Sequence, residues 1–424
     1  MLKLKAEIKG SSLQKNSVMR GVISTGLPFA CILKSKTFII LTQYDKGLFL
    51  NSPIKERNIK MGVLLETIQT LQIGQVVMWI IGGILIYLAI KKDMEPTLLL
   101  PMGFGAILVN LPMSGAKAVI DRLFEIGVEN NELMPLILFI GIGAMIDFEP
   151  LLTNPKLMIF GAAAQFGIFF TLSLASLFGF DLHDAASIAI IGAADGPTSI
   201  FVAQQLNSNY VAAIMVAAYS YMALVPIVQP PIIKLCTTKK ERMIRMKNVN
   251  RKVSKATKIL FPIVVTIIVG LVAPDAVALI GFLMFGNLIR ECGVLNSLSE
   301  TAQNVLANLI TIFLGITIAS RMVAAEFLQF ETLLIMGLGL VAFIFDTFAG
   351  VMLAKIINIF SKEKINPMIG ATGISAFPMS ARVVHKMGRE EDPQNFLLMH
   401  AIGVNVSGQI ASVIAGGLIL AFVA

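Results

Sequence analysis

The chain has 424 residues, of which 56% are apolar and only 14% are charged. Because soluble globular domains carry about 25% charged residues, the composition excludes a soluble domain, and the many apolar runs exclude a protein held by one membrane anchor. The net charge of +8 lies entirely in residues 1–60, which hold 11 Lys and Arg against 3 Asp and Glu. The remainder is neutral, so the charge gives no sign of nucleic-acid binding. The few cysteines and histidines are dispersed, which argues against a disulfide framework or a transition-metal site.

Residues 1–60 differ from the rest of the chain. Their longest apolar stretch, 27–42, is interrupted by Lys34 and Lys36 and is too short to span a membrane. They also lack the clean apolar core and small-residue cleavage site of a signal peptide. We expect a basic N-terminal extension that is disordered or results from a misassigned start, since Met61 begins a more plausible chain.

Apolar segments follow in two series on either side of a basic stretch. This stretch, 234–258, has ten Lys and Arg against one acid and is predicted to be a cytoplasmic loop, with docking of a soluble partner as a further possible role. Several segments are shorter than the ~20 residues that a spanning helix needs, which suggests half-helices or re-entrant segments. The predicted segments are 73–90, 97–111, 134–147, 156–178, 185–206, 210–233, 258–272, 275–290, 303–320, 332–358, 366–386 and 396–423.

The two series resemble each other, which predicts a first membrane repeat at 61–233 and a second at 259–424. Weak internal symmetry of this size is typical of transporters built from repeats, although chance similarity among apolar segments is the alternative. The fold class is therefore an all-α polytopic membrane protein with about ten to twelve transmembrane segments. We favour inverted repeats of five segments with one additional helix over parallel repeats of six. The matches are Phe104–Leu108 with Phe285–Ile289, Phe139–Gly143 with Phe313–Thr317, and Gly192–Ala194 with Gly370–Thr372.

An acid and a helix-breaking pair interrupt the apolar segment 185–206. Asp195 is followed at once by Gly196 and Pro197, and proline removes a backbone donor and clashes with the preceding turn. A charged side chain at the centre of a spanning helix costs roughly 2.5–3.5 kcal/mol on insertion scales. Backbone groups freed in hydrocarbon also need protein or water partners. The simplest explanation is a buried cation site with Asp195 as its charged ligand.

A second broken segment, 365–382, occupies the corresponding place in the other half. If the repeats are related as predicted, this segment faces Asp195. One carboxylate with amide, hydroxyl and carbonyl oxygens suits a hard monovalent cation such as sodium. Helix packing is the alternative for its small residues, and we favour packing for Ser380. The helix breakers are Pro367, Gly370, Gly373 and Pro378, and the polar side chains are Asn366, Ser375, Ser380 and Arg382.

Three further acids lie at or within apolar segments. Asp147 and Glu149 come at the end of a segment and are expected at the membrane interface. Asp346 lies inside an apolar run, where it could be a second ion or proton group. The alternative for Asp346 is a structural hydrogen bond to Thr347 or to a neighbouring helix.

Three stretches carry a family resemblance: Gly192–Thr198, Ala218–Pro226 and Asn366–Val383. They closely resemble the membrane-embedded beta subunit of the sodium-pumping biotin-dependent decarboxylases, which act on oxaloacetate, methylmalonyl-CoA or glutaconyl-CoA. The resemblance runs from about residue 70 to the C-terminus and leaves residues 1–60 outside. One departure is Val404, which stands where the family pattern has proline.

The resemblance implies a coupled reaction in which carboxybiotin is decarboxylated, a proton is consumed and sodium ions are exported. Carried over to this chain, the sodium ligands or their supports would be Asp195, Asn366 and Ser375, with Asn405 also available. This assignment gives both broken segments a part in one site.

The resemblance also implies roles for three residues outside the sodium ligands. Tyr221 would be a proton-handling hydroxyl near the site, Arg382 would contact the carboxybiotin anion, and Gly370 would allow close backbone approach. The residues alone do not choose between Tyr219 and Tyr221, and aromatic packing is the alternative for either.

The family's partners and location complete these expectations. The resemblance implies a multi-pass protein of the inner (plasma) membrane, assembled with biotin-carrying and carboxyltransferase subunits, a small gamma- or delta-type membrane subunit and further copies of itself. The sequence has no Met-Lys-Met biotin-attachment pattern and no phosphate-binding glycine loop. Biotin should therefore arrive on a partner. The alternative function is a secondary sodium-coupled carboxylate transporter, and a non-catalytic membrane anchor is a third possibility.

Overall fold

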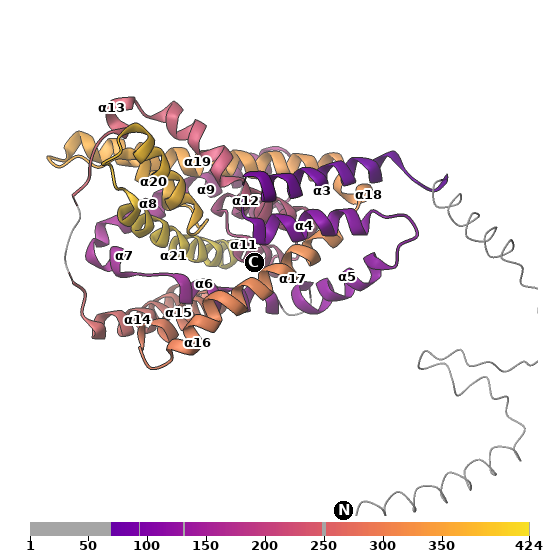
Figure 1. Ribbon diagram of the computed structural model, residues 1–424, viewed down its shortest axis with the longest axis horizontal. Coiled ribbons are helices and arrows are strands. Elements are labelled where there is room, and N and C mark those ends of the chain that lie inside the picture. Colours follow the sequence, from indigo (N-terminus) through magenta and orange to yellow (C-terminus); the bar gives the residue numbers. More distant parts are fainter. Residues whose placement is uncertain (1–68, 93, 130–131, 248–251, 424) are drawn as a thin grey trace, which may run out of the picture. The chain divides into compact units, whose positions relative to one another are not determined.

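The computed structural model describes residues 69–92, 94–129, 132–247 and 252–423, and every regular element in these ranges is helical. Residues Thr67–Ala424 form one compact unit, whose helices Figure 1 shows. Up to the basic loop the helices are α3 (Ile73–Lys92), α4 (Pro96–Val109), α5 (Ala116–Phe124), η2 (Glu125–Glu129), α6 (Leu133–Met145), α7 (Glu149–Thr153), η3 (Pro155–Leu157), α8 (Met158–Ala163), α9 (Phe166–Leu177), α10 (Leu182–Ala189), η4 (Ile190–Ala193), α11 (Gly196–Gln205) and α12 (Val211–Cys236). From the loop onward they are α13 (Lys239–Arg242), α14 (Lys255–Val272), η5 (Pro274–Ala276), α15 (Val277–Glu291), α16 (Asn296–Glu300), η6 (Thr301–Leu306), α17 (Ala307–Ile318), η7 (Ala319–Arg321), α18 (Ala324–Phe327), α19 (Phe330–Phe360), η8 (Pro367–Gly373), α20 (Met379–Glu391) and α21 (Leu398–Val423).

Most of the predicted apolar segments are helices of membrane-crossing length. Within the described ranges, seven helices are long and apolar enough to cross a membrane, and three shorter apolar helices accompany them. The two segments predicted to be short, 97–111 and 275–290, are the short helices α4 and α15. The predicted fold class is therefore confirmed, whereas the number of spans and the repeat remain predictions. The extension predicted for residues 1–60 lies outside the described residues.

The predicted segment 366–386 is interrupted, as its helix breakers lead one to expect. It consists of the 3-10 helix η8, an irregular stretch and then α20. Pro367 starts η8, and Pro378 caps α20. Because α20 carries Arg382 and further charged side chains on one face, it is an amphipathic helix rather than a membrane span. By contrast, α21 runs through Val404 without a break, as expected where no proline stands.

Two helix crossings join the predicted repeats, and each crossing contains one helix from each repeat. α6 packs on α15, and a Cβ added to Gly143 or Gly286 would overlap a backbone carbonyl of the facing helix. α4 packs on α17, where Gly105 and Gly315 lie close to the opposite backbone. By sequence, α4 matches α15 and α6 matches α17. In space, α4 packs on α17 and α6 packs on α15, so the two contacts are equivalent when the halves are exchanged. A two-fold relation between the halves would produce this pattern, although the repeat itself stays a prediction.

Three long helices surround the two broken segments. α12 and α19 lie side by side (Figure 1). α19 also packs on both η4 and η8. α21 packs on η8 and on α11. At 1.5 Å per residue, the 31 residues of α19 extend over about 46 Å. The breaks in the first and second halves are thus enclosed together inside the helical unit.

Candidate functional site

The first predicted break occurs at Asp195. After the 3-10 turn η4, Ala194 adopts the left-handed conformation (φ 52°) and α11 begins at Gly196. Asp195 caps α11: the Thr198 N–H lies 3.5 Å from Oδ1, and the Thr198 hydroxyl donates to Oδ2 at 2.8 Å. The side chain is buried, with 4% of its surface exposed. A helix N-terminus therefore faces the carboxylate and stabilises its negative charge.

The C-terminal helix α21 presents polar side chains to both breaks. Gln409 Nε2 donates to Asp195 Oδ2 at 3.0 Å. One turn earlier, Asn405 Nδ2 donates to the carbonyls of Thr372 (3.2 Å) and Ile374 (2.7 Å). Asn405 Oδ1 is buried and has no hydrogen-bond partner in the described part of the chain. A buried amide oxygen without a partner is an available ligand for a cation or a water molecule.

Ser375 joins the two broken segments directly. Its backbone N–H donates to the Ala193 carbonyl at 3.0 Å. Its hydroxyl donates to the Gly408 carbonyl at 3.2 Å and shares a hydrogen bond with the Ser412 hydroxyl. Ala193 lies two residues before Asp195, so the predicted meeting of the two breaks is present in the structure. We call Asp195, Ser375, Asn405, Gln409 and Ser412 the Asp195 cluster.

Asn366 lies at the other end of the second broken segment. Its Oδ1 accepts the N–H of Met368 at 3.1 Å, and its Nδ2 donates to the carbonyls of Arg242 (2.8 Å) and Ile244 (2.9 Å). The seven residues of η8, at about 2 Å of rise each, separate it from the Asp195 cluster by about 14 Å. Asn366 therefore caps η8 and clamps the basic loop, and the structure does not bring it together with Asp195.

Tyr219 and Tyr221 have different surroundings although both lie on α12. A Cβ at Gly196 would overlap the Tyr219 ring, so this ring packs on the residue directly after Asp195. The Tyr219 hydroxyl is buried without a hydrogen-bond partner among the described residues. The Tyr221 hydroxyl instead donates to the Met336 carbonyl of α19. The structure thus places Tyr219 beside Asp195, and Tyr221 against α19.

Gly370 and Arg382 lie outside the Asp195 cluster. The close approach predicted for Gly370 is made with Gly350 of α19, because a Cβ on either glycine would overlap the carbonyl of the other. Arg382 is exposed on α20, a helix that packs on α12, α21 and η8.

The first part of the basic loop is fastened to α20. Arg242 Nε lies 2.7 Å from Glu391 Oε1. Arg245 forms a two-pronged pair with Asp392, at 2.6 and 3.1 Å. The Arg245 guanidinium lowers the pKa of the Asp392 carboxyl. Together with Asn366, these pairs order the loop at the start of η8.

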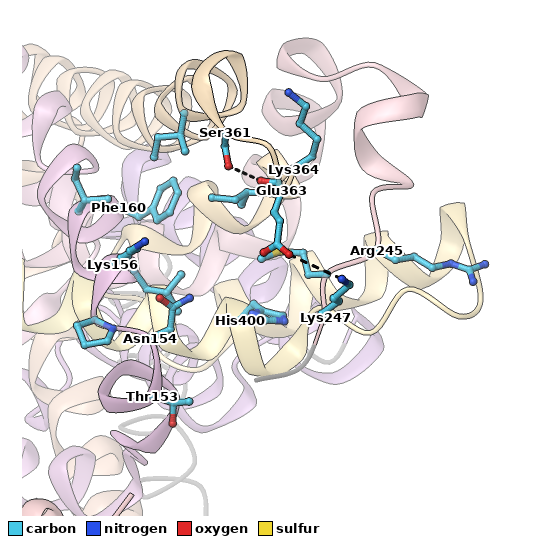
Figure 2. Close-up of a pocket in the computed structure, with 16 residues that line it drawn as sticks. Thr153, Asn154, Lys156, Phe160, Arg245, Lys247, Ser361, Glu363, Lys364 and His400 are labelled. Carbon is cyan, nitrogen blue, oxygen red and sulfur yellow. Dashed lines mark hydrogen bonds and ion pairs between the residues drawn. The ribbon is translucent and has the colours of Figure 1, made fainter. Parts of the chain in front are cut away.

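A cavity of about 1010 Å³ lies beside this loop (Figure 2). Among the residues that the structure describes, Glu363 is the one acid in its lining, and it lies 3.8 Å from Lys247 Nζ. His400, near the start of α21, is buried and its Nε2 has no hydrogen-bond partner among the described residues. The cavity is therefore predominantly basic and suits an anionic group. Its basic lining residues are Lys156, Arg245, Lys247, Lys364 and His400.

Sequence reasoning missed three members of the hydrogen-bond network around Asp195: Thr198, Gln409 and Ser412. The first could have been found from the capping rule, since Thr198 is the third helical residue after an Asp cap. The other two follow Asn405 at helical spacings of four and seven, which places all three on one face of α21. The cluster offers a carboxylate, an amide oxygen and hydroxyls, an all-oxygen set of the kind that hard cations prefer.

Comparison with known proteins identifies related chains. The family model of the Na⁺-transporting oxaloacetate decarboxylase beta subunit matches residues 74–423. The methylmalonyl-CoA decarboxylase subunit beta of Propionigenium modestum is 48% identical over 376 residues, which cover 82% of this chain and 95% of that protein. The oxaloacetate decarboxylase beta chain of Haemophilus ducreyi is 46% identical over 420 residues (84% and 96%). That of Klebsiella pneumoniae is 45% identical over 413 residues (82% and 95%).

Proposed function

This chain belongs to the family of membrane-embedded beta subunits of sodium-transporting decarboxylases, and from that premise we propose that the Asp195 cluster is its sodium site. The observation that carries the proposal is the hydrogen bond from the Ser375 N–H to the Ala193 carbonyl, which joins the two helix breaks beside a buried carboxylate. Sodium is the transported substrate, and the Asp195 carboxylate compensates its charge inside the membrane.

The neutral oxygens of the cluster complete the proposed site. Asn405 Oδ1 is available because no described residue hydrogen-bonds to it. The hydroxyls of Ser375 and Ser412 hydrogen-bond with each other and with the Gly408 carbonyl, and each hydroxyl oxygen keeps a lone pair that can face a cation. Gln409 and Thr198 hold the Asp195 carboxylate in place. Asn366 supports the site indirectly by fixing η8 and the loop, and Tyr221 by packing on α19.

The driving reaction involves the end of the structure that carries the basic loop. A biotin-carrying partner supplies carboxybiotin, whose decarboxylation provides the exergonic step and consumes a proton. Arg382 is exposed and always charged, and its planar guanidinium can bind a carboxylate through two N–H groups. The free energy released by decarboxylation must exceed about 2.3 kcal/mol for each charge moved against 100 mV.

The proposed setting is a complex in the inner (plasma) membrane. It contains biotin-carrying and carboxyltransferase subunits, a small gamma- or delta-type membrane subunit and further copies of this chain. The basic loop and the cavity beside it form a positively charged face for these partners. Affinity purification of the natural complex tests this directly, because recovery without any biotinylated protein would contradict it.

The sodium site is tested with Asp195→Asn in the assembled complex. We expect sodium-stimulated decarboxylation of carboxybiotin to be lost, because the substitution removes the charge that compensates the ion. Ser407→Ala on the same helix is the matched control, since Ser407 bonds to the carbonyls of Val404 and Leu157 rather than to the cluster. Full sodium stimulation in Asp195→Asn would refute the site. Uptake of a free carboxylate by this chain alone would instead favour a secondary transporter.

A further inference from the structure

A second buried acid, Asp346, lies at the midpoint of α19 and has no part in the Asp195 cluster. Its side chain is fully buried. α19 packs here on α9 and on η4, so Asp346 faces elements from the first half of the chain. An acid this deep in a spanning helix is costly unless its charge is compensated or removed.

One oxygen of Asp346 is bound to the start of a half-helix. The Gly167 N–H donates to Oδ1 at 2.5 Å. Gly167 lies in the first turn of α9, directly after the interruption between α8 and α9. A Cβ at Gly167 would lie 2.5 Å from Oδ1, so glycine is needed for this contact. Asp346 therefore caps α9 from a neighbouring helix, and this role accounts for the surroundings of Oδ1 only.

The other oxygen points to the break that contains Asp195. A Cβ on Gly192 would lie only 2.7 Å from Asp346 Oδ2. Gly192 belongs to η4, three residues before Asp195. Oδ2 has no hydrogen-bond partner among the described residues. A buried carboxylate oxygen without a partner is costly, and a capping role does not account for it.

No charged group in the elements packed on α19 is placed to neutralise Asp346. Within their described residues, α8, α9, η4 and η8 contain no titratable side chain. α10 contributes His183 and Asp184, which bond to Leu206 and to Ser208 and Asn209. α12 contributes Lys234, Cys236 and the two tyrosines, of which Tyr221 bonds to Met336. α18 contributes Glu326, and α19 itself carries Glu331 and Lys355, the last paired with Glu241.

We propose that Asp346 is a second cation-binding carboxyl group of the membrane unit and that the cation it binds is a proton. The geometry favours a proton over a metal ion, because the described neighbours of the carboxyl group are backbone N–H groups and a glycine rather than several oxygens. A proton on Oδ2 removes the charge and provides a donor. The 3-10 turn η4 has carbonyl groups without α-helical partners, which can accept it.

The placement couples the proton to the sodium site. Asp346 Oδ2 touches η4 at Gly192, and Asp195 directly follows the same turn. A negative charge on Asp346 and a cation at Asp195 attract each other across low-dielectric surroundings. Loss of the proton should therefore strengthen sodium binding, and sodium binding should promote loss of the proton. The coupling between the two sites rests on the proposed sodium site, whereas the proposal that Asp346 binds a proton does not.

The test is infrared difference spectroscopy of the whole complex in lipid, recorded across pH. We expect a protonated-carboxyl C=O band that Asp346→Asn abolishes and Asp195→Asn retains. Asparagine keeps the oxygen that accepts the Gly167 N–H, so the cap on α9 is preserved. Thr347→Val is the matched control on the same helix and should leave the band unchanged. A band that persists in Asp346→Asn would overturn the proposal.

A second variant covers the case in which Asp346→Asn fails to assemble. Gly192→Ala places a methyl group against Oδ2 and should shift the same band. Sodium affinity, measured by thermal stabilisation of the complex, should vary with pH by about tenfold in the unmodified chain and less in Asp346→Asn. Loss of a sodium-binding step in Asp346→Asn without loss of the band would assign sodium to this site instead. Failure of the Asp195 site alone would leave the infrared result intact.

Discussion

Gln409 Nε2 lies 3.0 Å from Asp195 Oδ2, although the two residues are 214 positions apart. The contact joins the last helix of the chain to the first helix break. It matters because an amide donor orients the carboxylate without neutralising it, as groups that hydrogen-bond to metal ligands generally do.

Gln409→Ala is expected to weaken sodium binding by about tenfold, in line with the loss of other groups that orient metal ligands. The expected cause is freer rotation of the Asp195 carboxylate, which keeps its Thr198 contacts. Sodium-induced thermal stabilisation of the complex measures the effect. Ser407→Ala, on the same helix, serves as control, and equal sodium affinity in both variants would contradict the orienting role.

Removing the two tyrosine hydroxyls of α12 one at a time should show which of them affects sodium binding. Tyr219→Phe is expected to change sodium affinity, because its hydroxyl lies beside Asp195 without another partner. Tyr221→Phe removes the hydrogen bond to Met336 and should lower stability by about 1 kcal/mol while sodium affinity stays unchanged. Sodium titration and thermal unfolding measure the two effects. A change of sodium affinity in Tyr221→Phe but not in Tyr219→Phe would instead support a functional role for Tyr221.

Asn366→Asp distinguishes a loop clamp from a sodium ligand. A carboxylate cannot donate to the carbonyls of Arg242 and Ile244, and it would repel both. We therefore expect the variant to loosen the loop and to increase its proteolysis, whereas a sodium ligand would tolerate the added carboxylate. Limited proteolysis of 234–258 is the measurement. An intact loop with tighter sodium binding would restore Asn366 to the ion site.

Gly370→Ala should be strongly destabilising. A Cβ there would overlap the Gly350 carbonyl, and backbone cannot yield as a flexible side chain can. Overpacking of this kind costs about 1–3 kcal/mol or more. Gly337→Ala on the same α19 is the control, because nothing lies within 4 Å of its added Cβ. Thermal unfolding in detergent should show a clear loss for the first variant and none for the second.

Glu132, at the start of α6, predicts a pH dependence of stability. Burial raises its pKa from 4.5 to about 7, and a hydrogen bond with Gln205 opposes the shift in part. The folded state therefore retains a proton that the unfolded chain loses above pH 4.5. Stability contributed by this group is present below that pH and is lost as the pH rises through about 7.

Glu132→Gln should remove this loss. We expect its unfolding temperature to match that of the unmodified chain near pH 4 and to exceed it by about 2 °C at pH 8. Thermal unfolding at both pH values is the measurement. Glu125→Gln, an exposed position of the same polar segment, is the control. A gain that is equal at both pH values would point to a cause other than the proton.

The helices and the first break were predictable because their signals are local. Apolar runs give the spanning helices, and the Asp195-Gly196-Pro197 order gives both the break and its cap. The second break was predictable from its prolines and glycines, but the sequence did not separate the 3-10 helix η8 from the amphipathic helix α20 that follows it. Local composition does not show where a short 3-10 helix ends.

The members of the site could be predicted only in part, since they depend on long-range contacts. Asp195, Ser375 and Asn405 were predicted and lie together, whereas Asn366 was assigned to the same site and lies at the loop. The breaks were expected to meet, but nothing in the spacing says which end of η8 faces Asp195. Likewise, no periodicity distinguishes Tyr219 from Tyr221, because the choice depends on how α12 is rotated against its neighbours.

The glycine crossing of α6 and α15 constrains how the two halves can move. Gly143 and Gly286 each admit a carbonyl of the opposite helix where any side chain would collide. Sliding either helix along the other would bring bulkier residues into that gap, so translation there is sterically blocked. The crossing can still act as a pivot. Relative motion of α6 and α15 is therefore expected to be a rotation about this point, with the largest displacements far from it.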